Sequence, residues 1–402
     1  MDLRNFENSP TGSLQPIEVE ERGELVAHAA FIPDDLPSSL SLAPSTWTVA
    51  MSAVEMLGRL DAVTTELQVD PVLLSKPTIR REAVSTSALE GTFAPAEDVL
   101  KSEVDLDLPR TSAVQEILNY IDATNHGVGR ITELPIGTRL ARELQDRLIR
   151  GTASDDYQRG ELRQTQVIIG PYKGCSVKDA TYVPPPPGKQ LEDGMDQWEK
   201  WVNQTSDLHV VVKIAIAHYQ FEALHPFTDG NGRIGRLIAI LQLIEADVLA
   251  GPILNLSPHF ERKSEEYRFR LREVSISGDW DGWIAFFCEA LTEQAKEAID
   301  RVHALLTWRS NTIDKLRAAN HKGLILEIAE GLISEPTLNV NSVVASSGKT
   351  TAAANTAVNK LVEAGVLVEV TGAKYNRIFQ AVEVIAILFG DQPSNKSSTQ
   401  RG

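Results

Sequence analysis

Cysteine is nearly absent from this sequence of 402 residues. Its two cysteines, Cys175 and Cys288, are far apart and lack the spacing of metal ligands. Two such residues exclude a small scaffold held together by disulfides, and their scarcity is typical of proteins that work in a reducing compartment. We therefore expect a cytoplasmic protein.

Basic residues are also in short supply. Lysine and arginine number 39 against 55 aspartates and glutamates, which gives a formal net charge of −16 at pH 7. A surface this acidic repels the phosphates of nucleic acid unless a local basic patch overrides it. No such patch stands out along the sequence, so nucleic-acid binding is disfavoured as the main activity.

Long hydrophobic runs are missing as well. The longest apolar stretch, residues 237–250, includes Gln242, Glu245 and Asp247 and is too short to span a bilayer. Residues 1–24 have neither the basic start nor the apolar centre of a secretory signal. We expect a soluble protein with no membrane partner, and its 42% of hydrophobic residues is enough for two or three globular domains.

Apolar residues spaced three and four apart predict a mainly helical chain. Residues 1–30 have the composition of a polar N-terminal arm, and residues 32–39 that of an extended connector. Pro77 is expected in the first turn of one helix, with Gly91 just beyond its end. The pattern predicts helices over residues 46–67, 77–89, 112–124, 193–203, 208–223, 232–246, 265–274 and 280–309, of which 232–246 is apolar nearly all round and should be central.

One segment in the middle of the chain carries a β signal. Residues 166–171 and 180–183 are β-prone and flank a loop that holds Gly174. This pattern predicts a β-hairpin.

Short helices near the C-terminus are followed by β-prone runs at residues 366–370 and 377–382. This order is typical of a winged helix-turn-helix domain, which we place at residues 313–388, with a disordered tail over 389–402. Between residues 321 and 390 five cations stand against six anions, so the domain is not basic. A protein contact or a homodimer is favoured for it, and DNA binding stays open.

A glycine-rich turn at the start of a predicted helix has the features of a phosphate site. Gly230, Asn231 and Gly232 let backbone N–H groups point to one place, and the helix N-terminus adds partial positive charge. Arg233 and Arg236, about one turn apart, can donate to further phosphate oxygens. The turn therefore predicts a binding site for the phosphates of a nucleotide.

Two titratable residues precede this turn. Asp229 lies at its edge, and a carboxylate beside phosphates is a common ligand of Mg²⁺. His225 has a side chain that accepts a proton near neutral pH. Phosphate donors, a magnesium carboxylate and a base together indicate attack of a hydroxyl group on a nucleotide phosphate.

Other glycine patterns compete with this interpretation. The spacing of Gly230, Gly232 and Gly235 has the form of a dinucleotide-binding fingerprint, but that fingerprint follows a strand and the preceding run here has helical spacing. Residues 348–350 resemble the end of a P-loop, but Val343 stands where its first glycine belongs. A plain glycine-rich connection between helices with incidental charges is the remaining alternative.

The segment 225–236 is similar, at every specified position, to the signature of the Fic family: His, any, Phe, any, Asp or Glu, Gly, Asn, Gly, Arg, any, any, Arg. Residues 160–163 with the predicted hairpin resemble the family's target-docking flap, and residues 279–283 resemble the segment that closes its core. The resemblance implies a mainly α Fic fold, with an N-terminal helical cap at residues 31–115 and a catalytic core at 116–300, ahead of the winged helix.

The resemblance also implies an activity, that of an enzyme that transfers AMP from ATP to a Ser, Thr or Tyr hydroxyl of a target protein with the help of Mg²⁺. His225 would deprotonate the hydroxyl and Asp229 would hold the magnesium. A target segment would dock on the flap as an added strand. The residues implied to bind ATP are Gly230, Asn231, Gly232, Arg233 and Arg236 at the phosphates, with Gln220 and Tyr267 in the nucleotide pocket.

Three other activities stay open. The same site could remove AMP or transfer another phosphate-bearing group. The chain could also be a DNA-binding regulator whose core senses nucleotide.

Residues 86–91 resemble the family's inhibitory motif, with Thr86, Glu90 and Gly91 at its specified positions. Thr86 and Glu90 are four residues apart and share a helix face. The resemblance implies that Glu90 reaches a phosphate-binding arginine, with Arg236 as the expected partner, and occupies the place of the γ-phosphate. The alternative is an ordinary acidic residue at a helix end.

Overall fold

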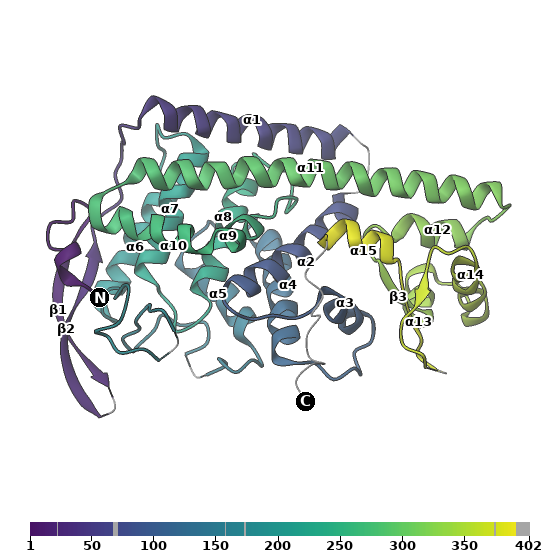
Figure 1. Cartoon of the computed structure of the whole chain (residues 1–402), viewed down its shortest axis with the longest axis horizontal. Helices are drawn as coiled ribbons and strands as arrows, with labels where there is room; N and C mark the ends of the chain where they lie inside the picture. Colours follow the sequence, from purple (N-terminus) through teal and green to yellow (C-terminus); the bar gives the residue numbers. More distant parts are fainter. Residues whose placement is uncertain (22, 67–70, 157, 173, 374, 391–402) are drawn as a thin grey trace, which may run out of the picture.

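The computed structural model describes residues 1–21, 23–66, 71–156, 158–172, 174–373 and 375–390. Within them the chain is mainly helical, as predicted (Figure 1). The helices are α1 (Pro44–Glu66), α2 (Pro71–Leu89), α3 (Ala96–Val104), α4 (Ser112–Arg130), α5 (Thr138–Ile149), α6 (Lys189–Asn203), α7 (Val210–Leu224), α8 (Asn231–Glu245), α9 (Ser257–Arg262), α10 (Ser264–Ser277), α11 (Trp280–Ala318), α12 (Leu324–Gly331), α13 (Val340–Ser347), α14 (Thr351–Glu363) and α15 (Val382–Phe389). The strands are β1 (Gly12–Glu21), β2 (Glu24–Pro33), β3 (Thr337–Asn339), β4 (Val368–Glu369) and β5 (Ile378–Gln380).

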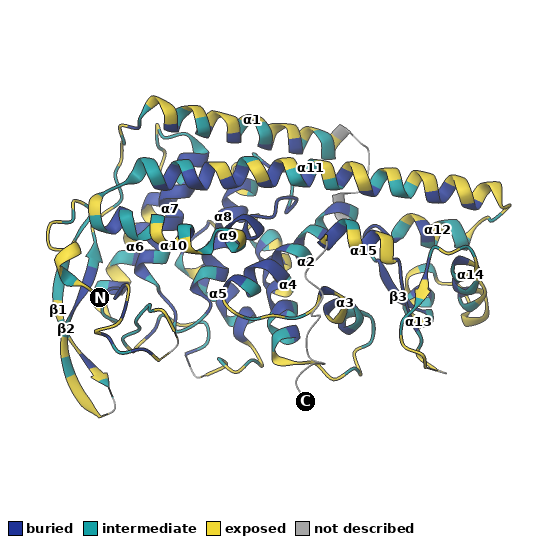
Figure 2. Ribbon diagram, viewed as in Figure 1, coloured by how far each residue is buried: buried dark blue, intermediate teal, exposed yellow. Residues whose placement is uncertain are grey.

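Helices α7 and α8 form the centre of the molecule, because their sequences are apolar on nearly every side and bury accordingly (Figure 2). Two tryptophans fix the surrounding helices to α7. The indole N–H of Trp198 on α6 donates to the carbonyl oxygen of Ala217 at 3.0 Å, and that of Trp283 on α11 donates to Ala215 at 2.8 Å. These bonds satisfy buried donors and set the position of the helix that ends at the candidate base.

The long helix α11 extends beyond the core and connects it to the C-terminal unit (Figure 1). Its N-terminus is capped by Asp279, whose carboxylate accepts from the N–H of Gly282 at 2.9 Å. Asp281 in its first turn accepts from the N–H of Ala43, just before α1, at 2.8 Å. Helix α1 thereby packs alongside α11 and covers one side of the core.

The prediction of a polar N-terminal arm is wrong. Strands β1 and β2 pair antiparallel along their whole length, from Gly12 opposite Pro33 to Glu21 opposite Glu24. The apolar side chains alternate with acidic ones, so the average composition is polar although one face buries Phe31. That face packs on the rest of the molecule, which makes the hairpin part of the fold.

The flap between residues 166 and 183 is not a regular hairpin, in contrast to the prediction. Among its described residues a single antiparallel bridge joins Ile169 and Tyr182. Pro171 directly after the bridge has no N–H to continue a ladder. The N-terminal segment supports the flap instead, since the N–H of Phe31 donates to Val183 at 2.8 Å.

One helix prediction needs correction, and helices α3, α5, α9 and α15 were not predicted. Helix α2 begins at Pro71, so Pro77 lies inside the helix rather than in its first turn. The proline has no N–H to donate within the helix, and packing outweighs the lost bond. Helices α3 and α5 were missed, although Leu140, Leu144 and Leu148 recur at the spacing of an amphipathic helix.

The C-terminal unit follows the predicted order of helices and then a small hairpin. Helices α12 to α14 pack with a three-stranded antiparallel sheet in the order β3-β5-β4, whose strand β3 was not predicted. Arg80 of α2 binds the carboxylate of Glu335 at 2.7 Å and so attaches α2 to this unit. The tail predicted from residue 389 falls outside the described residues from 391 onward, while Phe389 ends α15 and is buried.

In the described parts of the chain, none of the helices combines the length and the apolar character needed to cross a bilayer.

Candidate active site

The turn between α7 and α8 owes its shape to its own side chains. Helix α7 ends at Leu224; the next residue, His225, has a left-handed backbone (φ 48°, ψ 61°), and Gly230 has φ 89°. The amide of Asn231 accepts from the N–H of Phe227 and donates to its carbonyl oxygen, both at 2.8 Å. The side chain of Asn231 is thus engaged within the turn, and what it offers a ligand is its backbone N–H.

Backbone donors gather at the start of α8. Asn231, Gly232 and Arg233 are its first residues, so their N–H groups have no partner within the helix. A Cβ atom at Gly232 would collide with the carboxylate of Glu90 and approach the guanidinium of Arg236 to 2.8 Å. Glycine at this position therefore leaves room for an anion against the helix N-terminus.

Arg236 is paired with two residues of the predicted inhibitory motif. Its Nη2 lies 2.6 Å from Oε1 of Glu90, and its Nε donates to the hydroxyl of Thr86 at 2.8 Å. Although burial alone raises the pKa of Glu90, the neighbouring guanidinium lowers it below its usual range. The structure thus brings an ionised carboxylate to the arginine that was expected to bind phosphate.

His225 is held from the backbone side by Arg163. The Nε of Arg163 donates to the carbonyl oxygen of His225 at 2.8 Å, and its N–H donates to Pro226 at 2.9 Å. Burial, and after it the charge of Arg163, lowers the pKa of the His225 imidazole to about 4. The ring is therefore neutral at pH 7 and ready to accept a proton.

Arg163 is the positioning residue that sequence analysis placed only within the flap. Its side chain is 1% exposed and also donates to the carbonyl oxygens of Pro185, Leu224 and Thr165. We predict that Arg163→Lys lowers the free energy of unfolding by about 2 to 4 kcal/mol, because lysine cannot serve these carbonyl groups together.

Urea denaturation measures this loss, with Arg4→Lys as the control. Arg4 keeps 83% of its side chain exposed, so its variant should unfold like the parent. Equal stability of the two lysine variants would show that Arg163 does not hold the turn.

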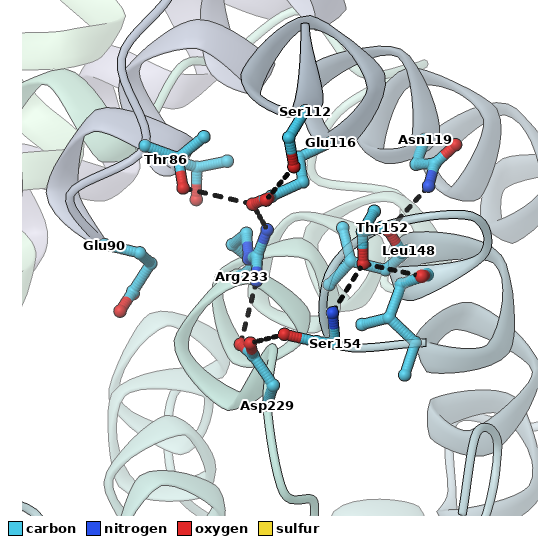
Figure 3. A network of polar contacts seen from close by, with 12 residues as sticks. Thr86, Glu90, Ser112, Glu116, Asn119, Leu148, Thr152, Ser154, Asp229 and Arg233 are labelled. Atoms are coloured by element: carbon cyan, nitrogen blue, oxygen red, sulfur yellow. Dashed lines mark hydrogen bonds and ion pairs between the residues drawn. The ribbon is translucent and has the colours of Figure 1, made fainter. Parts of the chain in front are cut away.

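Asp229 belongs to a polar network on the other side of α8, which Figure 3 shows. Its carboxylate accepts from Nη2 of Arg233 at 2.9 Å and from the hydroxyl of Ser154. Nη1 of Arg233 binds Glu116 at 2.9 Å, and Glu116 also accepts from the hydroxyl of Thr92 at 3.0 Å. Arg233 is thus neutralised by two carboxylates, so its predicted role at the outer phosphates has less support than that of Arg236.

The chemistry of Asp229 fits a magnesium ligand. Burial raises the pKa of its carboxyl group, but Arg233 and Ser154 lower it to a net value below the usual range. Mg²⁺ is commonly bound by one or two carboxylates together with substrate phosphates, so a single aspartate beside a phosphate site is sufficient. Within the described residues, no group of three or more His, Cys, Asp or Glu side chains is arranged to hold a metal ion.

Several of the predicted residues line one cavity of about 540 Å³. His225, Gly232, Arg236 and Glu90 line it, together with Tyr267, whose hydroxyl lies 2.8 Å from Nε2 of His218. The flap residues Ile169 to Pro171 and Tyr182 form part of the wall.

Gln220, the other residue predicted for the nucleotide pocket, is not on the described wall of this cavity. Its amide donates to the carbonyl oxygen of Asp34 at 3.1 Å and so ties α7 to the N-terminal connector. Glu222, two residues later, does line the cavity and was not predicted.

Two family profiles match the chain. Residues 135–243 match the Fic/DOC family, and residues 47–129 match the Fic/DOC family N-terminal region. The chain is 33% identical over 158 residues to the protein adenylyltransferase Fic of Drosophila grimshawi, and 30% identical over 158 residues to the protein of that name from Drosophila melanogaster. Each alignment covers 39% of this chain and 30% of the relative, so the chain spans under a third of those relatives.

Solved structures show the same fold. A Fic family protein from Desulfovibrio desulfuricans G20 superposes with a TM-score of 0.56 at 20% identity, over 85% of this chain and 97% of that one. Fic-1 from C. elegans superposes with a TM-score of 0.50 at 21% identity, over 65% and 74%. The helical core is therefore a Fic fold. With both family profiles in order along it, the chain is similar to Fic/DOC proteins over residues 47–129 and 135–243.

Proposed function

We propose that this chain is a protein adenylyltransferase, which moves AMP from ATP to a hydroxyl side chain of a target protein, and that Glu90 inhibits it. The observation that carries the proposal is the cavity in which a neutral imidazole, His225, faces the N-terminus of α8 and Arg236. An acceptor of a proton next to donors for phosphate is what the reaction needs. The curated relatives named above support the same activity.

Each group has a defined task in this reaction. The free N–H groups at the start of α8 bind phosphate oxygens, and Arg236 binds the terminal phosphate once Glu90 has left. His225 takes the proton of the attacking hydroxyl, whose oxygen then bonds to the α-phosphorus while pyrophosphate leaves. Bound magnesium would neutralise phosphate charge, with Asp229 as its protein ligand.

The flap supplies a place for the target. Residues 169–171 and Tyr182 line the cavity that His225 enters, so a segment lying along the flap presents its hydroxyl to the imidazole. We propose that the target docks there as an extended strand.

We further propose that the C-terminal unit is a winged helix that contacts protein, including a second copy of the chain. Its order of helices and strands supports the fold. Between residues 321 and 390 it carries five cations and six anions, a balance that disfavours binding to DNA phosphates. A cytoplasmic location belongs to the same proposal.

Two positions of the label on ATP distinguish AMP transfer from transfer of the terminal phosphate. The Glu90→Gly variant is incubated with magnesium and ATP that carries its label on either the α- or the γ-phosphate. AMP transfer puts only the α-label on protein, so protein labelled from the γ-phosphate would contradict the proposal.

A further inference from the structure

Glu222 is a buried carboxyl group on the cavity wall to which the proposed reaction assigns no task. It lies in the last turn of α7, and both Glu222 and His225, the residue directly after that helix, line the cavity. Its side chain is 13% exposed, and its Oε1 is buried without a hydrogen-bond partner among the described residues. Because a buried polar atom without a partner costs free energy, this oxygen is available to a ligand.

Glu222 lies beside α8, the helix whose N-terminus is the proposed phosphate site. Gly235 of α8 lies opposite, and a Cβ atom there would come within 2.7 Å of Oε1. Arg236 is the next residue, and Glu90 is bound to it. The other charged or titratable groups around this part of the cavity come from four places. They are His218 and Tyr219 on α7, His225 directly after that helix, Tyr182 in the flap, and Glu265, Tyr267, Arg268 and Arg272 on α10.

The protonation of Glu222 differs from that of its neighbours. Burial raises its pKa to about 7, with Arg236 opposing this rise and Glu90 adding to it. Burial instead lowers the pKa of His218 to about 3 and that of His225 to about 4, so both rings are neutral at pH 7. Glu222 is therefore the group with a shifted pKa that changes its charge near neutral pH.

A bound triphosphate favours the protonated form of Glu222. Phosphate oxygens that replace Glu90 at Arg236 bring negative charge to the same place, and negative charge there already raises the pKa of Glu222. A protonated carboxyl group donates an O–H bond, whereas the ionised group only accepts and repels phosphate.

We propose that Glu222 is a phosphate-binding residue that acts in its neutral form: its O–H group donates to a phosphate oxygen of the nucleotide, and binding is thereby coupled to protonation of Glu222. This inference rests on the proposed nucleotide site. The proton comes from solvent, and no covalent bond to the residue forms.

The test compares ATP binding with and without the titrating group. Isothermal titration calorimetry of magnesium–ATP is run on Glu90→Gly and on Glu90→Gly with Glu222→Gln, at about pH 6 and about pH 8. We expect affinity to fall at least about tenfold across this range with glutamate and to stay nearly constant with glutamine, since only the protonated fraction binds. Ionisation of ATP itself is common to both proteins and cancels.

A second measurement needs no substitution at Glu222. Calorimetric titrations of Glu90→Gly with magnesium–ATP, repeated in buffers of different ionisation enthalpy, count the protons that the protein takes up on binding. Above neutral pH we expect uptake to approach about one proton per ATP bound. No uptake, or an equal fall in affinity in both variants, would overturn the inference. If Glu90→Gly binds no ATP at either pH, the proposed function fails instead.

Discussion

Replacing Glu90 by glycine raises the rate of AMP transfer about tenfold to a hundredfold. The carboxylate of Glu90 must leave Arg236 before a terminal phosphate can take its place, and a charge-assisted hydrogen bond of this kind contributes about 1.5 to 3 kcal/mol. Every 1.4 kcal/mol is a factor of about ten. Because 38% of the Glu90 side chain is exposed, the lower half of this range is expected.

Self-labelling with α-labelled ATP measures this gain. Glu90→Gln, which keeps the volume of the side chain and removes its charge, separates electrostatic inhibition from steric blocking. Glu97→Gly in the exposed first turn of α3 is the control for a lost helix-end glutamate, and we expect no gain from it. Labelling of Glu90→Gly at or below the parent level would exclude Glu90 as the inhibitory group.

Replacing His225 by alanine in the Glu90→Gly background lowers transfer by about a hundredfold to ten-thousandfold. General base catalysis by a positioned side chain contributes about this much. ATP affinity should change little, because the donors at the start of α8 and Arg236 remain. The loss should therefore appear in the rate at saturating ATP rather than in binding.

The pH dependence gives a second check on His225. With a pKa of about 4, the imidazole is unprotonated from about pH 6 upward, so its own titration should leave the rate flat there and reduce it only as the pH falls toward that value. His303→Ala, on the exposed side of α11, is the matched control and should keep full activity. Equal loss in both variants would contradict the assignment of the base.

Short-range features of the site could be predicted from sequence, because the residues that form the turn are contiguous. The segment from His225 to Arg236 contains its own shaping bonds, such as those between Asn231 and Phe227. Glu90 and Arg236 are 146 residues apart, and nothing local indicates their contact. Their pairing was expected only through the resemblance to a family.

Gln220 was predicted for the nucleotide pocket and Glu222 was not, although the spacing of residues along α7 distinguishes them. Tyr219 and Glu222 are three residues apart and share the face of α7 that lines the cavity, whereas Gln220 lies off that face. Arg163 could not be found in this way, because three of its four carbonyl partners, Pro185, Leu224 and His225, lie at least 22 residues away in the sequence.

The predictions for the N-terminal segment and for the flap were wrong for a different reason. Average polarity hid the alternation in β1, and β propensity in the flap suggested a ladder that Pro171 interrupts. In both segments the pairing depends on tertiary contacts, such as the bond from Phe31 to Val183, that single-sequence patterns do not contain.

The most direct test is a crystal structure of the Glu90→Gly variant with magnesium and a non-hydrolysable ATP analogue. We expect the triphosphate at the first N–H groups of α8, its terminal phosphate on Arg236, and the imidazole of His225 open toward the α-phosphate, with room for a hydroxyl oxygen about 3 to 3.5 Å from phosphorus. A turn without nucleotide, with Arg236 directed elsewhere, would contradict the central claim.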